Sequence, residues 1–496
     1  MGFAQDRTAP VVNTRSGPVR GVVEGDLAVF RGVPYAAPPI GPLRWRPAQP
    51  HQGWSGTLDA TTHAPGSPQA VREGDPILGG HGFPPFDEDC LTLNVWTPGT
   101  DEARRPVLVW IHGGAFVSGS GAMPNYSGET FARHGDLVVV NLNYRLGPLG
   151  MLSFPSQVGS GCGNAWLTDQ LAALRWVQDN IAGFGGDPGN VTVAGQSAGA
   201  LSTAALAGHG VDGRPLFRRA VLQSVPLAMP LATPAEALER TAAYLEIVGA
   251  KDEDALRTVP WPRLVEATAE LLAATTEWGH WTTPFMPVLD GGTAVRQPAL
   301  NLLDGPGADI DVLIGWTSQE SAFAFALGGT YRSATREQVL RRARDGFGDG
   351  AAEAYAAYES ARPDARPVDV LIDLTTDELF RKPTLAFAEE RAARGRPVWA
   401  YEFAFPTPAH DGRLGAPHCL DLPFVFDNFD KWSHAPFLAG MDTGTRDGLA
   451  RTMNQAWISF VRTGDPNHPA MPRWDRYDRP SRTTMRFDTV SSAVRT

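Results

Sequence analysis

The chain has 496 residues, 43% of them hydrophobic, which is enough for a large core. The formal net charge is -11, and no segment is dense in lysine or arginine, so a nucleic-acid partner is not expected. The cysteines are few and widely spaced, which argues against a disulfide framework and a CxxC metal site: Cys90, Cys162 and Cys419.

The N-terminal segment, residues 1–10, lacks the apolar core of a secretory signal. No apolar run approaches the length of a membrane span. A cytoplasmic protein without a membrane contact is therefore expected, although a mature secreted form with an added start methionine would have the same sequence.

Predicted strands and helices alternate along the chain after an irregular first third. Residues 18–23 and 27–30 predict a hairpin, and the proline-rich residues 31–54 are too irregular for a helix. The buried strands expected next are residues 91–96, 107–111, 137–144, 191–194, 220–223, 312–315 and 398–403. The expected helices are residues 169–180, 234–248, 336–344, 377–394 and 443–463.

Buried strands that alternate with helices predict an α/β fold, with a mostly parallel central sheet covered by helices on both faces. No repeat period and no low-complexity linker divides the chain. We therefore expect one domain over residues 1–496. Large helical insertions at about residues 225–395, interrupted by the core strand near residues 312–317, are expected to form a lid.

The most informative segment is residues 191–199, Val-Thr-Val-Ala-Gly-Gln-Ser-Ala-Gly. A buried strand, then Gly-x-Ser-x-Gly, then a helical run of small residues is the nucleophile elbow of the α/β-hydrolase fold. The turn is tight, so a Cβ at Gly195 or Gly199 is expected to collide with a neighbouring element. Ser197 then stands exposed above the sheet as the candidate nucleophile. Ala198 places its N–H at the helix N-terminus, where an anion is favoured.

A second motif, His112-Gly113-Gly114, directly follows the strand expected at residues 107–111. Oxyanion loops of the His-Gly-Gly type have this position, because glycines let bare N–H groups turn toward the substrate. Gly113, Gly114 and Ala198 are the candidate donors. The run alone is equally compatible with an ordinary turn, and its combination with the elbow favours the oxyanion hole.

The general base and its orienting acid are expected after the serine, in the order serine, acid, histidine. His418 follows the last expected core strand after a loop and is the first candidate for the base. His410 is the second candidate, and His434 and His468 are rivals by position. Glu320, just past the strand at residues 312–315, is the candidate acid.

Three other carboxylates are less suitable as the acid. Asp309 and Asp311 precede the strand at residues 312–315 and would lie at its wrong end. Asp290 stands in a Leu-Asp-Gly-Gly run, for which turn formation is a sufficient explanation.

These motifs resemble the type-B carboxylesterase family, which contains the cholinesterases and bacterial para-nitrobenzyl esterases. The likeness covers nearly the whole chain, and Glu320 and His418 stand at the positions of the family's acid and base. It implies a serine hydrolase that forms an acyl-enzyme with small to medium, apolar or aromatic esters, without a metal or other cofactor. The partner it implies is a small-molecule ester. The oligomeric state stays open. The segments that carry the likeness include residues 17–21, 30–36, 88–95, 143–147, 184–188 and 463–467.

The chain departs from the family pattern at three places. Gln196 stands where the family usually has glutamate, which removes a negative charge, keeps hydrogen bonding and argues against a preference for cationic substrates. Ser67 stands near the usual partner of Cys90, so Cys90 is expected to be a buried thiol. Trp166 replaces a small glycine, and its bulk is expected to reshape the floor or the wall of the pocket near the elbow.

Several aromatic residues are candidates for the substrate pocket together with Gln196 and Trp166. For Trp278, Trp281 and Phe285 core packing under a lid is favoured, and an aromatic acyl or leaving-group pocket is the alternative. Phe323 and Phe424, beside the acid and the base, carry the same ambiguity.

Two further functions remain as alternatives to simple ester hydrolysis. The same residues serve for a carbamate, an amide or a natural-product ester such as a mycotoxin ester, because a fold does not determine the substrate. A non-catalytic, partner-binding homologue is less favoured, because every position of the triad is filled.

Overall fold

The computed structural model describes residues 9–71, 73–155, 163–362 and 364–496. The first eight residues, on which the expected absence of a secretory signal partly depends, lie outside this description, and so does Cys162. Within the described residues, no helix has both the length and the apolar character needed to cross a membrane.

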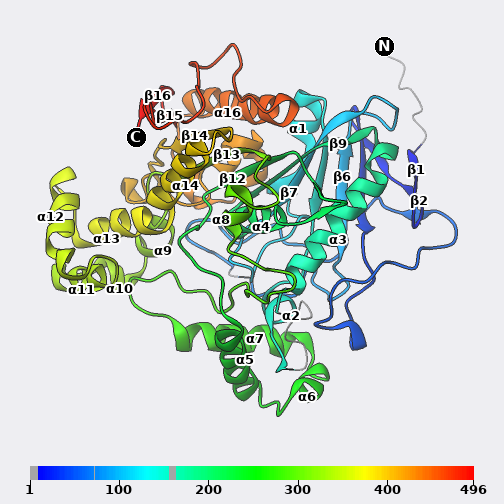
Figure 1. The fold of residues 1–496 in the computed structure, drawn as a ribbon, viewed down its shortest axis with the longest axis horizontal. Helices are drawn as coiled ribbons and strands as arrows, with labels where there is room; N and C mark the ends of the chain where they lie inside the picture. Colours follow the sequence, from blue (N-terminus) through cyan, green and yellow to red (C-terminus); the bar gives the residue numbers. More distant parts are fainter. Residues whose placement is uncertain (1–8, 72, 156–162, 363) are drawn as a thin grey trace.

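A mixed sheet of eleven strands forms the centre of the part that is described (Figure 1). Its strands lie in the order β16-β15-β14-β13-β12-β9-β7-β8-β6-β4-β3. The strands from β15 to β8 in this order run parallel, and the antiparallel pairs lie toward the two edges. The mostly parallel sheet that the sequence predicts is therefore confirmed.

The bounds of the strands and covering helices are as follows. The strands of the central sheet are β3 (Val22–Glu24), β4 (Leu27–Pro34), β6 (Thr92–Thr97), β7 (Arg105–Ile111), β8 (Val138–Leu142), β9 (Gly186–Gln196), β12 (Arg219–Gln223), β13 (Asp311–Thr317), β14 (Val398–Phe403), β15 (Thr483–Phe487) and β16 (Ser492–Arg495). The smaller sheets contain β1 (Val11–Thr14), β2 (Gly17–Arg20), β5 (Leu58–Asp59), β10 (Gly210–Val211) and β11 (Arg214–Pro215). The covering helices are α1 (Glu129–Gly135), α2 (Gly147–Met151), α3 (Ala165–Asn180), α4 (Ala198–Leu206), α8 (Pro298–Leu303), α14 (Lys382–Ala393), α15 (Leu422–Phe426) and α16 (Thr443–Thr463).

Both faces of the central strands are buried. Along β7, Val107, Val109 and Ile111 belong to one hydrophobic cluster, whereas Leu108 and Trp110 belong to the other. This division follows from the two-residue period of a strand. Because neither face meets water, the strand has a continuous apolar sequence rather than an alternating one.

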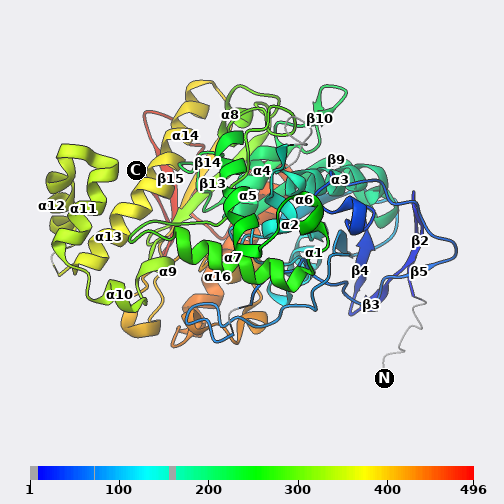
Figure 2. The same ribbon diagram turned by 90° about the horizontal axis from the view of Figure 1, so that it is seen from below.

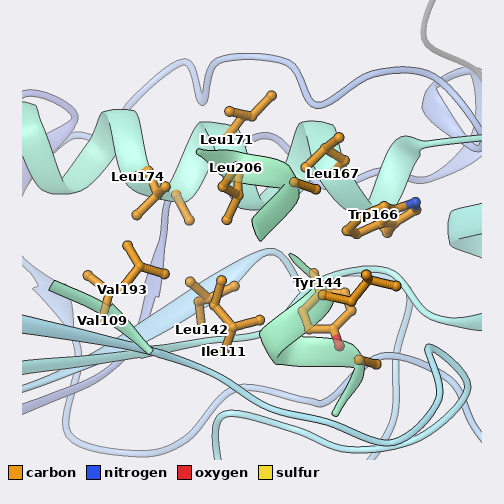
Figure 3. Close-up of a cluster of buried hydrophobic side chains, with 14 of the residues drawn as sticks. Val109, Ile111, Leu142, Tyr144, Trp166, Leu167, Leu171, Leu174, Val193 and Leu206 are labelled. Atoms are coloured by element: carbon orange, nitrogen blue, oxygen red, sulfur yellow. The ribbon is translucent and has the colours of Figure 1, made fainter. Parts of the chain in front are cut away.

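Helices cover the sheet on its two sides. Helices α3, α4, α8 and α14 pack on one face, and α1, α15 and α16 pack on the other. Figure 3 shows the first interface, where leucines of α3 lie over Val109, Val193, Ile111 and Leu142 of the sheet. Helix α4, which follows Ser197, packs against both β9 and α3.

Apart from α8 and α14, which cover the sheet, the α-helices between β12 and β14 gather in two groups. The first consists of α5 (Pro234–Val248), α6 (Glu253–Arg257) and α7 (Trp261–Thr275). Figures 1 and 2 both place it apart from the second group, in which α9 and α10 lead into three longer helices. That these groups form a lid within a single domain stays a prediction. The second group comprises α9 (Ala322–Phe325), α10 (Gly329–Arg332), α11 (Arg336–Phe347), α12 (Ala351–Ala361) and α13 (Pro367–Thr376).

Three predicted elements differ from the structure. Residues 18–23 are divided between β2 and β3, because the chain leaves β1 and pairs with β4 instead. The strand at residues 398–403 is not the last of the sheet, since β15 follows it with only two buried apolar residues, too weak a pattern to be recognised. The helix at residues 377–394 begins as a π-helical turn, Asp377–Arg381, that joins α13 to α14.

Candidate active site

Ser197 lies in the turn between β9 and α4, as the strand-turn-helix pattern predicts. Its φ of 57° and ψ of -122° are a strained conformation for a residue with a Cβ. Two backbone hydrogen bonds hold this turn: Ser197 N–H donates to Gln223 O of β12 at 2.9 Å, and Leu201 N–H donates to Ser197 O at 3.0 Å. The half-buried serine is therefore fixed at the N-terminus of α4.

The glycines on both sides of Ser197 lie against backbone atoms. A Cβ at Gly195 would be 2.4 Å from Gly199 O, and a Cβ at Gly199 would be 2.0 Å from Ile111 O. Neither neighbour is the end of a flexible side chain, so the collision that the sequence predicts is confirmed.

We expect Gly199→Ala to destabilise the protein by at least about 2 kcal/mol, because the added methyl group forces the elbow away from β7. The measurement is the apparent melting temperature by differential scanning fluorimetry. Gly329→Ala is the matched control, since a Cβ at Gly329 meets nothing within 4 Å. Equal melting temperatures for the two variants would contradict the close approach of α4 and β7.

His418 and Glu320 are in direct contact. His418 Nδ1 lies 2.5 Å from Glu320 Oε2, and Glu320 Oε1 accepts the Thr317 N–H at 2.8 Å. Both side chains are buried. Because an ionised carboxylate only accepts hydrogen bonds, Nδ1 carries the ring proton and Nε2 presents its lone pair.

The loops that carry this pair are tied together by their backbones. Gln319 N–H donates to Ala416 O at 2.9 Å, which joins the loop after β13 to the loop after β14. The carboxyl ends of these two parallel strands are neighbours in the sheet. The acid and the histidine therefore meet although they are far apart in the sequence.

The rival histidines have other partners. His410 Nε2 lies 2.8 Å from Pro76 O, and His434 packs edge-on against His81. His468 Nε2 lies 3.0 Å from a backbone carbonyl of α16. Of the four candidates, His418 is the one whose contacts within the described residues include Glu320.

The rival carboxylates also have other contacts. Asp309 pairs with Arg396 at the surface, and Asp311 lies 4.0 Å from Arg219 at the start of β13. Asp290 Oδ1 accepts two backbone N–H groups of its own turn, so turn formation explains its presence.

Gln196, the last residue of β9, lies between the histidine and the glycine loop. Its Nε2 is 2.8 Å from His418 Nε2, so the amide donates to the lone pair of the ring. A Cβ at Gly113 would lie 2.7 Å from Gln196 Oε1 and 3.3 Å from Ser197 Cβ. The side chain therefore touches both parts of the site, and Gly113 has no room for a larger residue.

The two peptide groups that contain the Gly113 and Gly114 N–H are fixed by hydrogen bonds to their carbonyl oxygens. His112 O accepts the Tyr144 hydroxyl at 3.0 Å, and Gly113 O lies 2.8 Å from His112 Nδ1. In a trans peptide the N–H points away from the C=O, so these bonds aim both N–H groups to the opposite side. Within the described residues, no protein acceptor is bonded to these two N–H groups or to that of Ala198.

The environment of the His112 side chain favours its hydrogen bond to Gly113 O. Its ring stacks on Tyr144 with centroids 4.5 Å apart, and burial lowers the pKa of His112 to about 4. The ring is therefore neutral near pH 7, and its Nδ1–H donates to Gly113 O.

Three aromatic rings surround the His418 imidazole. The centroid distances to the imidazole are 5.4 Å for Trp281, 5.8 Å for Phe323 and 5.4 Å for Phe380. Trp281 Nε1 donates to Ser321 Oγ at 3.2 Å, which fixes the indole beside the acid loop. These rings exclude water from the histidine and present apolar surface beside it.

Phe380 is a site residue that the sequence analysis did not find. It lies in the π-helical turn between α13 and α14. π-helical turns are rare and frequently occur at functional sites. The extra residue in the turn interrupts the helical period, so no sequence pattern indicates which way the ring faces.

The other pocket candidates lie elsewhere. Trp166 is buried and packs on Phe116 of the glycine loop at 4.8 Å, as part of the cluster in Figure 3. Phe285 packs on a tyrosine of α5, and Phe424 packs among other phenylalanines. Both are fully buried and make no ring contact with His418 in the described residues, which favours the core interpretation for them. Trp278 packs on a tyrosine of α10 with a centroid distance of 5.4 Å and tilted rings, and within the described residues it makes no ring contact with His418.

A second buried carboxyl, Asp421, lies three residues after His418. It accepts from Gln223 Nε2 at 2.8 Å and from the Tyr401 hydroxyl at 3.1 Å. Burial raises the pKa of Asp421 to about 6, although these two hydrogen bonds favour the carboxylate. Gln223 also accepts the Ser197 N–H through its backbone, so this network supports the elbow.

Cys90 is a free, buried thiol, as the replacement at Ser67 predicts. Burial raises its pKa far above the ordinary value, so the sulfur is uncharged. No cluster of three potential metal ligands occurs in the described part of the chain.

Comparison with known proteins gives four findings. The sequence model of the carboxylesterase family matches residues 8–496. The chain is 49% identical over 471 residues to the phenmedipham hydrolase of Pseudarthrobacter oxydans, with 95% of this chain and 93% of that protein covered. It is 36% identical over 485 residues to the para-nitrobenzyl esterase of Bacillus subtilis, with 97% and 95% covered. Among solved structures, a carboxylesterase of Geobacillus stearothermophilus aligns with a TM-score of 0.84 at 36% identity, over 97% of both chains.

Proposed function

The chain belongs to the carboxylesterase family, and on this premise we propose that Ser197, His418 and Glu320 are its catalytic triad. The protein has the α/β-hydrolase fold and is a hydrolase that acts on carboxylic esters of small molecules. The observation that carries the triad is the 2.5 Å contact between His418 Nδ1 and Glu320 Oε2, in loops that follow the carboxyl ends of parallel strands, as does Ser197 before α4.

In the proposed acylation step, His418 Nε2 takes the Ser197 hydroxyl proton while Oγ forms a bond to the ester carbonyl carbon. The carbonyl oxygen becomes an oxyanion and accepts hydrogen bonds from the N–H groups of Gly113, Gly114 and Ala198. The carbon–oxygen bond to the alcohol then breaks, and the imidazolium gives its proton to the leaving oxygen.

In the proposed deacylation step, water replaces the alcohol. His418 takes a proton from the water as the water oxygen attacks the acyl carbon, and the imidazolium returns a proton to Ser197 Oγ as the acid leaves. Glu320 stays ionised throughout and stabilises the imidazolium that forms in each step.

The surroundings of His418 favour apolar or aromatic esters as substrates. The half-buried Trp281 and Phe323 offer ring surface beside the base, and the buried Phe380 packs against the same imidazole. Gln196 supplies an uncharged amide where a carboxylate would attract a cation. We therefore assign aryl and apolar esters, rather than cationic ones, as the substrate class.

Carbamate hydrolysis is the second candidate, favoured by the 49% identity to a phenmedipham hydrolase, a carbamate hydrolase. A carbamate passes through the same steps, with a carbamoyl group on Ser197 in place of the acyl group. Its nitrogen donates electrons to the carbonyl, so the carbamoyl-enzyme reacts more slowly with water.

One experiment tests both candidates with a shared leaving group. We expect 4-nitrophenyl butyrate and 4-nitrophenyl N-phenylcarbamate each to release a burst of about one nitrophenolate per active site in stopped-flow absorbance. Mass spectrometry of the quenched reaction should place the acyl or carbamoyl group on the peptide that contains Ser197. Sustained turnover of the carbamate supports carbamate hydrolysis, and a burst without turnover restricts the function to esters. Modification of a different residue would overturn the proposed triad.

A further inference from the structure

The Gln196 amide is hydrogen-bonded to the His418 nitrogen that must accept the Ser197 proton. Its Nε2 lies 2.8 Å from His418 Nε2. Among the described residues, no hydrogen bond joins the Ser197 hydroxyl to this ring. A neutral imidazole has one lone pair on this nitrogen, so the amide and the hydroxyl compete for it.

The contact depends on the protonation state of the ring. With Nδ1–H bound to Glu320, the neutral ring accepts the amide N–H at Nε2. When the ring takes up a proton, Nε2 becomes a donor and faces the donating NH₂ group. In its present orientation Gln196 therefore stabilises the neutral ring and opposes the imidazolium.

Rotation of the amide about its last torsion exchanges the oxygen and the nitrogen with little change of shape. Oε1 would then face the imidazolium, and the NH₂ group would take the place of Oε1 near Gly113, whose N–H is one of the proposed oxyanion donors. After this single rotation the amide oxygen faces the positive imidazolium, and the NH₂ group lies on the side of the negative oxyanion. A glutamate at residue 196 has two acceptors and no donor, so it could not match the neutral resting ring.

The position of Gln196 is well defined. It is buried with 1% exposure, and its backbone is in register with Gln223 of the neighbouring strand β12. It directly precedes Ser197, so a change in its side chain can act on the base without displacing the strand.

We propose that Gln196 is a positioning residue that holds His418 in its neutral, proton-accepting form in the resting enzyme and rotates to accept from the imidazolium as the oxyanion forms. This inference rests on the proposed function, because it takes His418 as the base. It predicts that the amide keeps the enzyme active at mildly acidic pH.

A substitution at residue 196 changes this contact and also the hydrogen bond between the Gln196 side chain and the Cys419 thiol. Glu320 faces Nδ1, and Asp421 and Asp75 are further carboxyls near His418 and Cys419. Burial raises the pKa of the adjacent Cys419 thiol well above its ordinary value, so it adds no charge. The surrounding rings of Trp281, Phe323 and Phe380 carry none.

The test is the pH profile of kcat/KM for 4-nitrophenyl butyrate with Gln196→Glu and Gln196→Met. A carboxylate beside Nε2 favours the imidazolium, so Gln196→Glu should move the acid-limb midpoint up by about one to two pH units. At about pH 6 this is a loss of roughly tenfold or more, with little loss at about pH 9. Gln196→Met keeps the shape and removes the donor, so the midpoint should rise by about half a unit.

Gln52→Glu, at an exposed glutamine, controls for the added charge and should keep the wild-type profile. An unchanged acid limb in both Gln196 variants overturns the proposal, and so does an equal loss at every pH, which indicates a structural role. Ser197→Ala, measured in parallel, separates the two proposals. If it is inactive while the Gln196 variants keep the wild-type acid limb, only the role of the amide fails. If it is fully active, the triad itself fails.

Discussion

Replacement of Ser197 by alanine should lower kcat for 4-nitrophenyl butyrate by about 10⁴- to 10⁶-fold. The variant keeps the oxyanion donors and the histidine but has no oxygen that can bond to the acyl carbon. The remaining rate reflects binding and water attack in the same cavity. Initial rates and burst amplitude measure the effect, and the burst should disappear together with turnover.

The fold should survive this change. The Ser197 backbone, which donates to Gln223 O, keeps its hydrogen bond, and alanine is no larger than serine. The melting temperature should therefore stay close to that of the wild type. Ser360→Ala, on an exposed position of α12, is the matched control and should retain full activity. Wild-type turnover by Ser197→Ala would show that another residue is the nucleophile.

The sheet and the elbow could be predicted because local sequence determines them. Strands such as β7 and β8 are buried on both faces, so they appear as continuous apolar runs. The elbow needs glycines on both sides of Ser197 because backbone atoms lie where their Cβ atoms would be. Short strands at or next to a sheet edge, such as β1 and β15, bury few apolar side chains, and their sequences do not differ from those of loops.

Contacts between distant loops could be predicted only in part. The choice of His418 over His410 needed the family resemblance, since both follow β14 in irregular chain. The sequence indicates that Gln196 keeps a hydrogen-bonding group, but only the three-dimensional arrangement shows that His418 Nε2 is its partner. Phe380 gave no signal, because a π-helical turn places it against a loop that is distant in the sequence.

The sequence also does not show which of the aromatic candidates line the site. Trp281 and Phe323 contact the His418 ring, whereas Phe285 and Phe424 are packed in the core. All four belong to short apolar segments near loops, and composition does not distinguish a ring that lines a site from one beneath it. The distinction depends on which loops pack together, and this is a tertiary property.

Replacement of Glu320 by glutamine should lower kcat/KM by about 10³- to 10⁴-fold at neutral pH, although the side chain keeps its size. In the wild-type protein the Glu320 carboxylate accepts two hydrogen bonds, one from His418 Nδ1 and one from the Thr317 N–H. An amide has one oxygen for these two donors. Kinetics with 4-nitrophenyl butyrate measure the loss, with the exposed Glu337→Gln as the matched control.

Either orientation of the glutamine amide harms the site. With its oxygen on Thr317, the NH₂ group faces Nδ1, and the ring moves its proton to Nε2, where it cannot accept from Ser197. With its oxygen on Nδ1, the NH₂ group opposes the Thr317 N–H in a buried site, and no negative charge stabilises the imidazolium. Glu320→Asp keeps the charge and the tautomer but shortens the reach by one methylene, so its loss should be smaller than that of Glu320→Gln. An equal loss in both variants would mean that the packing of this side chain, rather than its charge and hydrogen bonds, supports His418.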